Sequence, residues 1–375
     1  MKKHLLRLAF INGLLFLSIC IFAQEYSDFY FTRVNGENGL SESNVKAILQ
    51  DSYGFMWFGT KNGLNRYDGT SILQFDCDDL EEGTGNHNIG ALFEDKERNL
   101  WVGTDRGVYI YNPAVDVFKR FKIASSEGIT LDNWVAEILS DSLDNIWVLI
   151  PDQGLFRYKD GKVHHYSLID KDNLKNNNPE CICINEQGEV WVGTSGIGLF
   201  KYNYRDDNFE QYLTDRMGRS LIDKTIISIC FQKENAILGI HEGDLLKYNT
   251  RTDELSEVSF LGEKKTFLRD VMCFGDEIWV GSLHGIFIIN EKENNVIHLK
   301  EDLMRSFSLS DNSIYSIYKD YEGGIWIGTM FGGVNYLPNR ILTFAKYVPG
   351  SDPYSLNTKR IRGLAEDNNG CIWIG

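Results

Sequence analysis

The amino-acid sequence predicts an all-β fold, a seven-bladed β-propeller of four-stranded antiparallel blades followed by the truncated start of an eighth repeat. Three observations predict it: a Trp-x-Gly-Thr motif recurs, each repeat holds four short apolar segments, and turn residues separate them. The steps between motifs run from 42 to 47 residues, a period typical of propellers and solenoids. The motif positions are Trp57, Trp101, Trp147, Trp191, Ile237, Trp279 and Trp326.

Each repeat has the same internal order. In the first repeat, AILQD (47–51) precedes the motif WFGT (57–60), and GLNRY (63–67) and ILQF (72–75) follow it. Gly, Asn and Asp residues separate these segments, which indicates hairpin turns and an antiparallel meander. A lone sheet of this kind has two apolar faces, and packing such sheets face to face around an axis buries both.

The recurring Trp is expected to be structural. It opens the second strand and would wedge between adjacent sheets, so that truncating it would cost about 3–5 kcal/mol through lost burial and the cavity left behind. The Asp-x-x-Gly before it indicates a hairpin turn whose Asp bonds its own backbone. The Gly after it indicates close blade packing or a positive φ. The stretch DSYGFMWFGTKNGLNRYDG (51–69) is therefore interpreted as part of a blade and not as a ligand loop.

The domain boundaries follow from the repeats. Residues 1–23 join a basic start to an apolar run, as in a cleavable signal peptide, with an uncleaved membrane anchor as the alternative. Residues 24–348 form the predicted propeller, in which YFTRV (30–34) is expected to pair with the seventh blade and remove an exposed edge. Residues 349–375 form an incomplete eighth repeat, so the chain is interpreted as a piece of a longer protein.

The amino-acid composition excludes some classes of binding partner. The formal net charge is −15, and an acidic surface repels phosphate groups, which argues against nucleic acid and anionic membranes. No CxxC pair or His-spaced cluster occurs, so neither a metal nor another cofactor is expected. Four cysteines that replace apolar residues in strand-like runs are interpreted as small buried hydrophobes and not as a disulfide framework. They are Cys181, Cys183, Cys230 and Cys273; Cys77 and Cys371 complete the set after the signal segment.

The segment GLSESNVKAILQDSYGFMWFGTKNGLNRYDG (39–69) resembles the two-component regulator propeller repeat, and the lead-in FTRVNGENGLSESNV (31–45) agrees with it. The resemblance covers essentially the whole mature chain in eight copies. It implies the periplasmic ligand-sensing region of a hybrid two-component sensor histidine kinase of the Bacteroidetes type. In such receptors two seven-bladed propellers precede an immunoglobulin-like domain, a membrane helix and the kinase.

The resemblance also implies partners. These are an oligosaccharide ligand and the remainder of the sensor kinase chain, which would anchor the full-length protein in the inner membrane and allow a homodimer. Two departures from the family pattern matter. Ile237 replaces the fifth Trp, and no kinase segment is present, so this chain is not expected to be an enzyme.

Residues that the repeat does not explain are the binding candidates. Propellers usually bind ligands on the face that carries the blade-to-blade loops and the turns from second to third strand. Trp134 lies in such a loop, where it could stack on a sugar ring or plug the propeller mouth. The other candidates are His87, Asp152, His241, Glu242, His284, Phe331 and Arg269. Two basic loops, at 216–219 and 264–269, could face a carboxylated or sulfated sugar.

Three functions stay open on the residues alone. The first is ligand sensing by reversible binding, the second a periplasmic propeller glycoside hydrolase or lyase, and the third a scaffold for a protein partner. No Gly-x-Ser-x-Gly elbow, HExxH or P-loop occurs, and the conspicuous acid of each repeat is explained as a turn residue. No catalytic residue is therefore predicted.

Overall fold

The structure is a computed structural model that describes residues 29–75, 88–122, 128–168, 178–212, 214–260, 266–305, 307–339, 356, 358, 360–368 and 370–375. In this part of the chain every element is a strand except the short 3-10 turn Gly36–Asn38. No helix among the described residues is long and apolar enough to cross a membrane. The prediction of an all-β fold is confirmed.

The described strands form antiparallel meanders. The first sheet holds β2 (Val45–Gln50), β3 (Met56–Thr60), β4 (Gly63–Tyr67) and β5 (Ile72–Phe75). The second holds β6 (Ile89–Glu94), β7 (Leu100–Thr104), β8 (Gly107–Asn112) and β9 (Val117–Arg120). The third holds β10 (Glu137–Ser140), β11 (Ile146–Ile150), β12 (Gly154–Lys159) and β13 (Lys162–Tyr166).

The next two meanders join into one eight-stranded sheet, because the end of the long strand β15 pairs with β18 at Ser195 and Ile197. Its first half holds β14 (Pro179–Ile184), β15 (Val190–Ile197), β16 (Leu199–Asn203) and β17 (Asn208–Tyr212). Its second half holds β18 (Ile222–Gln232), β19 (Asn235–Ile240), β20 (Leu245–Asn249) and β21 (Glu254–Glu257).

Two further four-stranded sheets follow, and the second of them contains the first strand of the chain. One holds β22 (Leu268–Phe274), β23 (Glu277–Ser282), β24 (Gly285–Asn290) and β25 (Asn295–Leu299). The other holds β26 (Ile314–Lys319), β27 (Ile325–Thr329), β28 (Val334–Leu337) and β1 (Thr32–Val34). A separate hairpin pairs β29 (Leu364–Glu366) with β30 (Ile372–Ile374).

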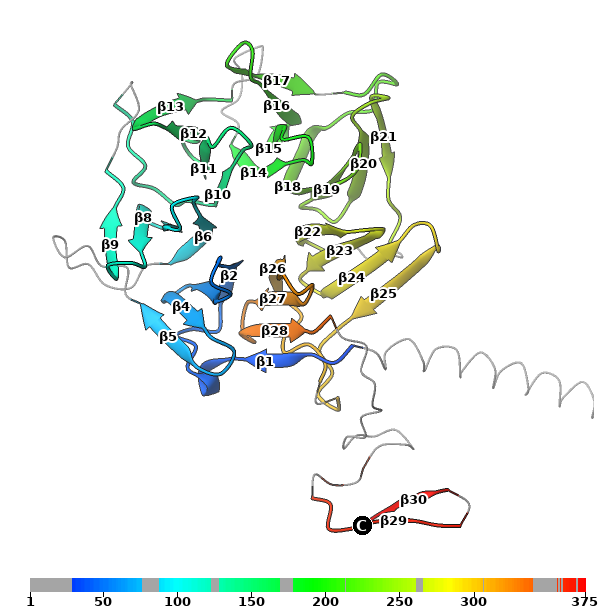
Figure 1. The fold of residues 1–375 in the computed structure, drawn as a ribbon. Coiled ribbons are helices and arrows are strands. Elements are labelled where there is room, and N and C mark those ends of the chain that lie inside the picture. The colour runs from blue at the N-terminus through cyan, green and yellow to red at the C-terminus, as the bar shows by residue number, and fades with distance from the viewer. Residues whose placement is uncertain are drawn as a thin grey trace, which may run out of the picture.

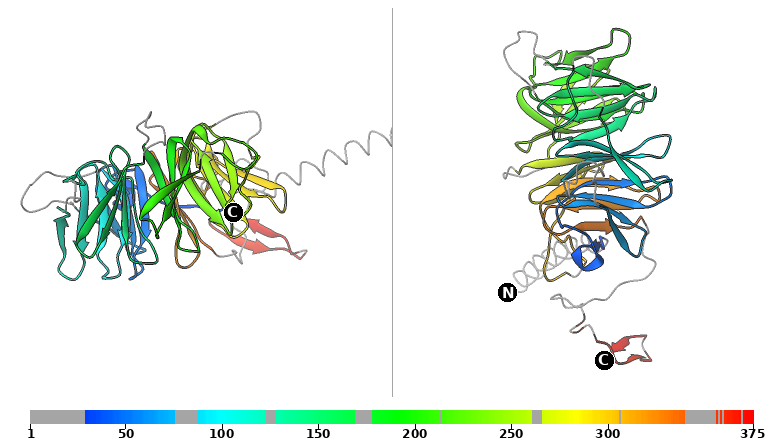
Figure 2. Two further views of the ribbon diagram at one scale, coloured as in Figure 1. Left: turned by 90° about the horizontal axis from the view of Figure 1, so that it is seen from above. Right: turned by 90° about the vertical axis from the view of Figure 1, so that its left-hand side faces the viewer.

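The sheets stand side by side in a ring, with the first strand of each repeat nearest the axis (Figure 1) and their faces packed against one another (Figure 2). Contacts between neighbouring sheets follow chain order, and β26 contacts β2 to complete the circle. The blue strand β1 lies along the orange strand β28, with Val34 opposite Val334 (Figure 1). The predicted pairing of the segment 30–34 with the last repeat of the ring is thereby confirmed for Thr32–Val34.

The core lies between neighbouring sheets. Trp101 of β7 shares a buried cluster with Val148 and Phe156 of the next sheet, and Trp326 packs with Phe58 across the junction of the last and first repeats. The Gly after the Trp allows this approach. A Cβ on Gly59 would lie 2.6 Å from the Cγ2 of Ile89 in the next sheet. Of the two expected roles of this Gly, close blade packing is the one observed.

The Asp of each turn does more than the sequence predicted. In the first repeat Asp51 Oδ1 accepts bonds from the backbone N–H groups of Tyr53 and Phe55, as expected for the turn. Its Oδ2 also accepts a 2.7 Å hydrogen bond from Nε1 of Trp57. The same Asp–Trp bond recurs at 95/101, 141/147, 320/326 and 367/373. One carboxylate therefore fixes both the turn and the wedge residue.

The interpretation of the cysteines is wrong for one pair. Cys230 of β18 and Cys273 of β22 form a disulfide with Cα atoms 5.7 Å apart, although both lie in apolar strand runs as expected. They are 43 residues apart, which is one repeat, so the ring brings them together on adjacent inner strands. Cys181 is a buried free thiol, as interpreted, and Cys183 is half-buried. Cys77 lies outside the described residues.

Candidate functional site

One end of every sheet carries the turn from the second to the third strand and the connection to the next sheet. Main-chain bonds tie these two parts together: Lys61 N donates to Asn44 O, and Asp105 N donates to Asn88 O. We call this end of the ring the connection face. Its described second-to-third-strand turns lie at 61–62, 105–106, 151–153, 198, 241–244, 283–284 and 330–333.

The inner strands share an irregularity next to the connection face. Between Val45 and Ala47 the pairing of β2 with β3 skips one residue, so Lys46 is a bulge residue without a partner on β3. Five other inner strands shift at the equivalent place. Their bulge residues are Gly90, Glu180, Ile227, Arg269 and Tyr315. A bulge re-aims a side chain, so the repeat carries a variable position at its innermost strand.

Lys46 reaches across the connection face. Its Nζ lies 4.6 Å from the ring centroid of Trp134, which precedes β10, although β6 lies between the two elements. The Trp134 ring in turn fills the place of a side chain at 90, since a Cβ on Gly90 would lie 2.6 Å from its Cη2 and Cζ2 atoms. Of the two expectations for Trp134, this packing is that of a plug; stacking on a sugar stays a prediction.

Arg269 is a second cationic residue of the connection face. It is exposed, and its guanidinium carbon lies 5.6 Å from the ring centroid of Tyr315 on the next inner strand. The pKa of Lys46 is lowered, first by burial and then by Lys61, while Asp105 opposes the shift and Arg269 adds to it. Lys46 and Arg269 therefore influence one another even though β26 separates their strands. We call Lys46, Trp134, Arg269 and Tyr315 the axial cluster.

An acidic pair occupies the third and fourth repeats. Asp152 is exposed in the turn after β11, and Glu180 is the bulge residue of β14. The pKa of Glu180 is raised, mainly by burial and additionally by the negative charge of Asp152. Asn178 Nδ2 lies 3.4 Å from Asp152 Oδ1 and can donate to it. These carboxylates offer hydrogen-bond acceptors on another part of the connection face from Arg269.

Two further acids lie on inner strands: Asp270 follows the bulge residue of β22, and Glu137 lies at the equivalent place in β10. Glu137 Oε2 accepts a 2.7 Å bond from the backbone N–H of Ile182 on the next inner strand, and Asp270 Oδ2 accepts a 2.8 Å bond from Ile317 N in the same way. Burial raises the pKa of Glu137 to about 8, with a smaller contribution from Asp270. Burial likewise raises the pKa of Asp270 to about 6. Both acids thus connect neighbouring inner strands.

The other predicted residues lie farther out on the connection face. His241 packs on Phe267 with ring centroids 5.0 Å apart, and Glu242 beside it is exposed. His284 Nδ1 lies 2.7 Å from the hydroxyl of Thr266. Phe331 is 71% exposed and its ring makes none of the ring contacts found among the described residues. His87, also predicted, lies outside the described residues.

Five residues of the connection face were not predicted from the sequence: Lys46, Glu137, Glu180, Asp270 and Tyr315. A signal for three of them was present, because Lys46, Glu180 and Tyr315 each precede the motif Trp of their repeat by 11 residues. Aligning the repeats on the Trp would have shown one column that is variable in charge and size. Their grouping could not be seen, because it depends on how the bulges and the ring place these side chains.

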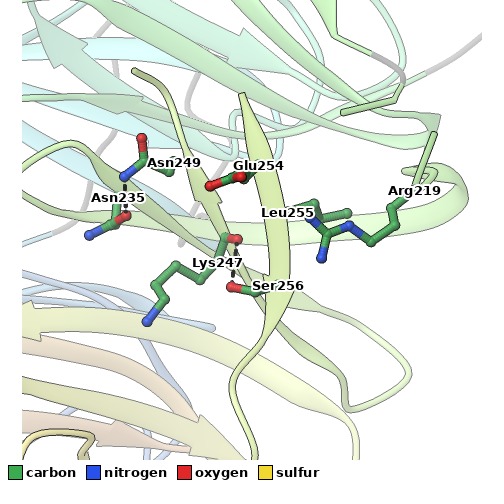
Figure 3. Close-up of a pocket in the computed structure, with 7 residues that line it drawn as sticks. All are labelled: Arg219, Asn235, Lys247, Asn249, Glu254, Leu255 and Ser256. Carbon is green, nitrogen blue, oxygen red and sulfur yellow. Dashed lines mark hydrogen bonds between the residues drawn. The ribbon is translucent and has the colours of Figure 1, made fainter. Parts of the chain in front are cut away.

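A shallow pocket of about 400 Å3 lies elsewhere, at the outer strands of the fifth repeat (Figure 3). Its polar side chains already bond one another: Asn249 Nδ2 donates to Asn235 Oδ1 at 2.9 Å, and Arg219 pairs with Asp215 at 2.7 Å. Arg216 pairs with Glu254 at its rim. This pocket is therefore held together by structural pairs, and the charges of the basic loop at 216–219 are used within the protein.

Across the described ranges no three His, Cys, Asp or Glu side chains come close enough together to hold a metal ion. Glu137 and Asp270 have the raised pKa values that general acids need, but each accepts a backbone bond that serves the packing of inner strands. The arrangement on the connection face is suited to reversible binding: exposed aromatic rings, two cations and carboxylate acceptors.

The fold defines the class of protein. A closed ring of antiparallel meanders, with each first strand at the axis and β1 pairing with the last sheet, is a β-propeller. The family model described as two component regulator propeller matches residues 39–62, 83–106, 308–331 and 355–375. The chain therefore contains two component regulator propeller repeats, as its sequence predicted.

The proteins that are similar to this chain include a histidine kinase and the extracellular domains of regulatory systems. The histidine kinase P4 of Formosa agariphila is 26% identical over 231 residues, which is 59% of this chain and 17% of that protein. The extracellular domain of the putative hybrid two component system BT3049 from B. thetaiotaomicron is similar with a TM-score of 0.71 at 24% identity, over 92% of this chain and 47% of that one. The corresponding domain of the putative one component system BT4673 gives a TM-score of 0.68 at 21% identity, over 92% and 51%. The chain thus spans about half the length of these solved domains and shares their fold.

Proposed function

We propose that this chain is the ligand-sensing propeller of a hybrid two-component sensor histidine kinase, seven-bladed and followed by the start of a second propeller. One observation carries the proposal: the two component regulator propeller model matches the first two repeats, the last repeat of the ring and the segment that follows it. The histidine kinase and the hybrid system among the similar proteins support it. The ligand is an oligosaccharide bound reversibly on the connection face, and no product is formed.

We place the chain in the periplasm, exported by residues 1–23, with the full-length protein anchored in the inner membrane. The disulfide between Cys230 and Cys273 supports this location, because such bonds persist in oxidising compartments. The extracellular origin of the similar solved domains agrees with it. Ligand binding would favour one arrangement of rigid propellers, and the kinase, as a homodimer, would respond to that shift.

Binding by the purified chain is the direct test. We expect an oligosaccharide library, screened by thermal shift, to yield at least one ligand that raises the melting temperature with increasing concentration, because a ligand that binds only the folded state stabilises it. The same mixtures, analysed by chromatography after incubation, should contain no new saccharide. Product formation would contradict sensing, and capture of a protein partner with no saccharide response would favour the scaffold function.

The size of the native protein is a second test. An antibody to residues 24–348 should detect a membrane-bound band far above 43.0 kDa in cell extracts. A soluble band near that mass would contradict the membership in a sensor kinase, whether or not saccharides bind.

A glycoside hydrolase is the second candidate, and one observation favours it. Glu137, with its pKa raised to about 8, holds a proton at neutral pH as a general acid would. Replacing Glu137 by Gln should then abolish turnover while the fold remains. If no turnover is found with the unaltered chain, this candidate is excluded for the substrates tried.

A further inference from the structure

We propose that Lys46, Arg269 and Tyr315 form a subsite on the connection face for the anionic group, a carboxylate or a sulfate, of a charged saccharide. This inference rests on the proposed binding of an oligosaccharide and names both its chemical class and the residues that select it. Three inner strands, β2, β22 and β26, supply the three side chains from the same bulge position of consecutive repeats around the ring.

The two cations of the subsite are free of ion pairs with the described carboxylates. Lys46 and Arg269 contact the aromatic rings of Trp134 and Tyr315, and neither makes an ion pair with any described carboxylate. Other cations of the chain are paired, such as Lys96 with Asp144 and Lys247 with Glu291. In a protein with a formal net charge of −15, two cations without an ion pair among the described residues, at the same bulge position of nearby inner strands, are well placed for an anionic ligand.

Neighbouring positive charges act on Lys46. Burial lowers the pKa of Lys46, and the positive charges of Lys61 and Arg269 lower it further. Lys61 and Arg269 thus disfavour the positive charge of Lys46. An anion between Lys46 and Arg269 would remove that repulsion and bond both cations at once, as charge-assisted hydrogen bonds are stronger than neutral ones.

Other side chains of the connection face can form hydrogen bonds with the uncharged part of the ligand. Tyr315 is half-exposed, and its hydroxyl has no hydrogen-bond partner among the described residues, so it can donate to an anionic oxygen or accept from a sugar hydroxyl. Glu180 and Asp152 lie in the third and fourth repeats and can accept bonds from sugar hydroxyl groups. A neutral sugar would use only these acids, whereas a charged sugar also engages the cations.

Ligand-detected NMR titrations of the full chain test the subsite with four probes: D-galacturonate, D-galactose 6-sulfate, D-galactose and inorganic sulfate. We expect the two charged sugars to bind at least about tenfold more tightly than galactose, since a hydrogen bond to a charged group contributes about 1.5–3 kcal/mol. Their binding should weaken as salt is added, because exposed charges are screened. This salt dependence tests the subsite without any substitution.

The variants Lys46→Gln and Arg269→Gln should each lose most of the preference for charged sugars, and their melting temperatures report whether the ring is intact. Lys96→Gln is the matched control, because Lys96 is an exposed cation in a first-to-second-strand turn, away from the connection face. It should bind as the unaltered chain does. Retained preference in both axial variants would overturn the subsite.

The remaining outcomes separate this inference from the proposed function. Binding of galactose equal to that of the charged sugars overturns the anionic subsite and leaves saccharide sensing intact. Inorganic sulfate that binds as tightly as the charged sugars overturns the saccharide assignment of these cations. If none of the four probes binds, the subsite is refuted, and the wider oligosaccharide screen decides separately whether the chain senses saccharides.

Discussion

The Asp of the repeat turn illustrates how much a single residue determines in this protein. Asp141 is only 4% exposed, and its carboxylate accepts bonds from Trp147 Nε1 at 2.9 Å and from the Tyr204 hydroxyl at 2.9 Å. Asn145 donates to it from both main chain and side chain. Burial acts to raise the pKa of Asp141, but these donors outweigh it, so the pKa is lowered. The charged form is the one that the fold requires.

We expect Asp141→Ala to lower the free energy of unfolding by about 2–4 kcal/mol, because several buried donors lose their acceptor at about 1–3 kcal/mol each. Urea denaturation followed by Trp fluorescence measures the loss. Lys96→Ala is the control, since its ion pair with Asp144 is exposed and should contribute no more than about 1 kcal/mol. Equal losses in the two variants would contradict the structural role of the turn Asp.

Glu137 gives a prediction about pH. Its folded-state pKa of about 8 lies above its ordinary value of 4.5, so the folded chain keeps a proton that the unfolded chain releases between these pH values. The stability that this proton supplies is complete below about pH 4.5 and is lost as the pH rises through about 8. Asp270 acts in the same direction over a lower range, since its pKa is raised to about 6.

Glu137→Gln removes the titration and keeps an acceptor for Ile182 N. We expect the variant to lose less stability than the unaltered chain between about pH 5 and pH 9, by about 4 kcal/mol, since about three units of the pKa shift fall in this range and one pKa unit corresponds to about 1.4 kcal/mol. Thermal unfolding at several pH values measures this. The exposed Glu242→Gln should follow the unaltered chain throughout. Parallel curves for Glu137→Gln and the unaltered chain would show that Glu137 titrates normally.

At the scale of elements, the inner strands combine a uniform backbone with variable side chains. The bulge occurs at the equivalent place in β2, β6, β14, β18, β22 and β26. The residue it presents ranges from Gly90 to Arg269 and Tyr315. The second strands, in contrast, keep the buried Trp or Ile, and all of them except β11, which has Leu149 at this position, keep the Gly that permits close packing. Function can therefore vary at the first strand without disturbing the contact between sheets.

The disulfide between β18 and β22 joins two such inner strands. Cys230 and Cys273 are 43 residues apart in the sequence. In the chain-entropy model, closing a loop of this length lowers the entropy of the unfolded state and thereby stabilises the folded state by about 4 kcal/mol. We expect the double variant Cys230→Ala with Cys273→Ala to unfold about 2–4 kcal/mol more easily in denaturant. A reducing agent should destabilise the unaltered chain similarly and leave the double variant unchanged.

Cys371→Ala provides the control, because Cys371 is an exposed free cysteine of the separate hairpin. It should match the unaltered chain under oxidising conditions. If the double variant is as stable as this control, the disulfide does not form in the purified protein.

At the scale of the whole molecule, the ring and the hairpin β29–β30 differ in how they bury apolar residues. The motif Trp residues of the ring are buried, whereas Trp373 of the hairpin is 66% exposed and Leu364 is 68% exposed. The Asp367–Trp373 bond is nevertheless formed, so the repeat motif organises its turn locally. Burial of the Trp, however, needs the neighbouring sheet.

We expect a variant that ends at residue 348 to keep the melting temperature of the ring within about 2 °C, because the described pairing of the hairpin is internal and surface changes usually stay near 0.5 kcal/mol. It should also aggregate less, since it lacks an exposed apolar strand edge. Thermal unfolding and light scattering measure the two effects. A much lower melting temperature would mean that residues beyond 348 support the ring.

The sequence by itself determined the repeat period, the all-β meander and the pairing of β1 with the last repeat of the ring. These follow from local rules: the motif spacing, the alternation of apolar segments with turn residues, and the need to bury two-faced sheets. Only the tertiary structure decided which side chains meet. Lys46 and Arg269 are 223 residues apart in the sequence (269 minus 46), and Cys230 and Cys273 are one repeat apart. Their proximity depends on ring closure and on one-residue shifts in strand register, which no local pattern specifies, because both arise from the packing of whole sheets against one another.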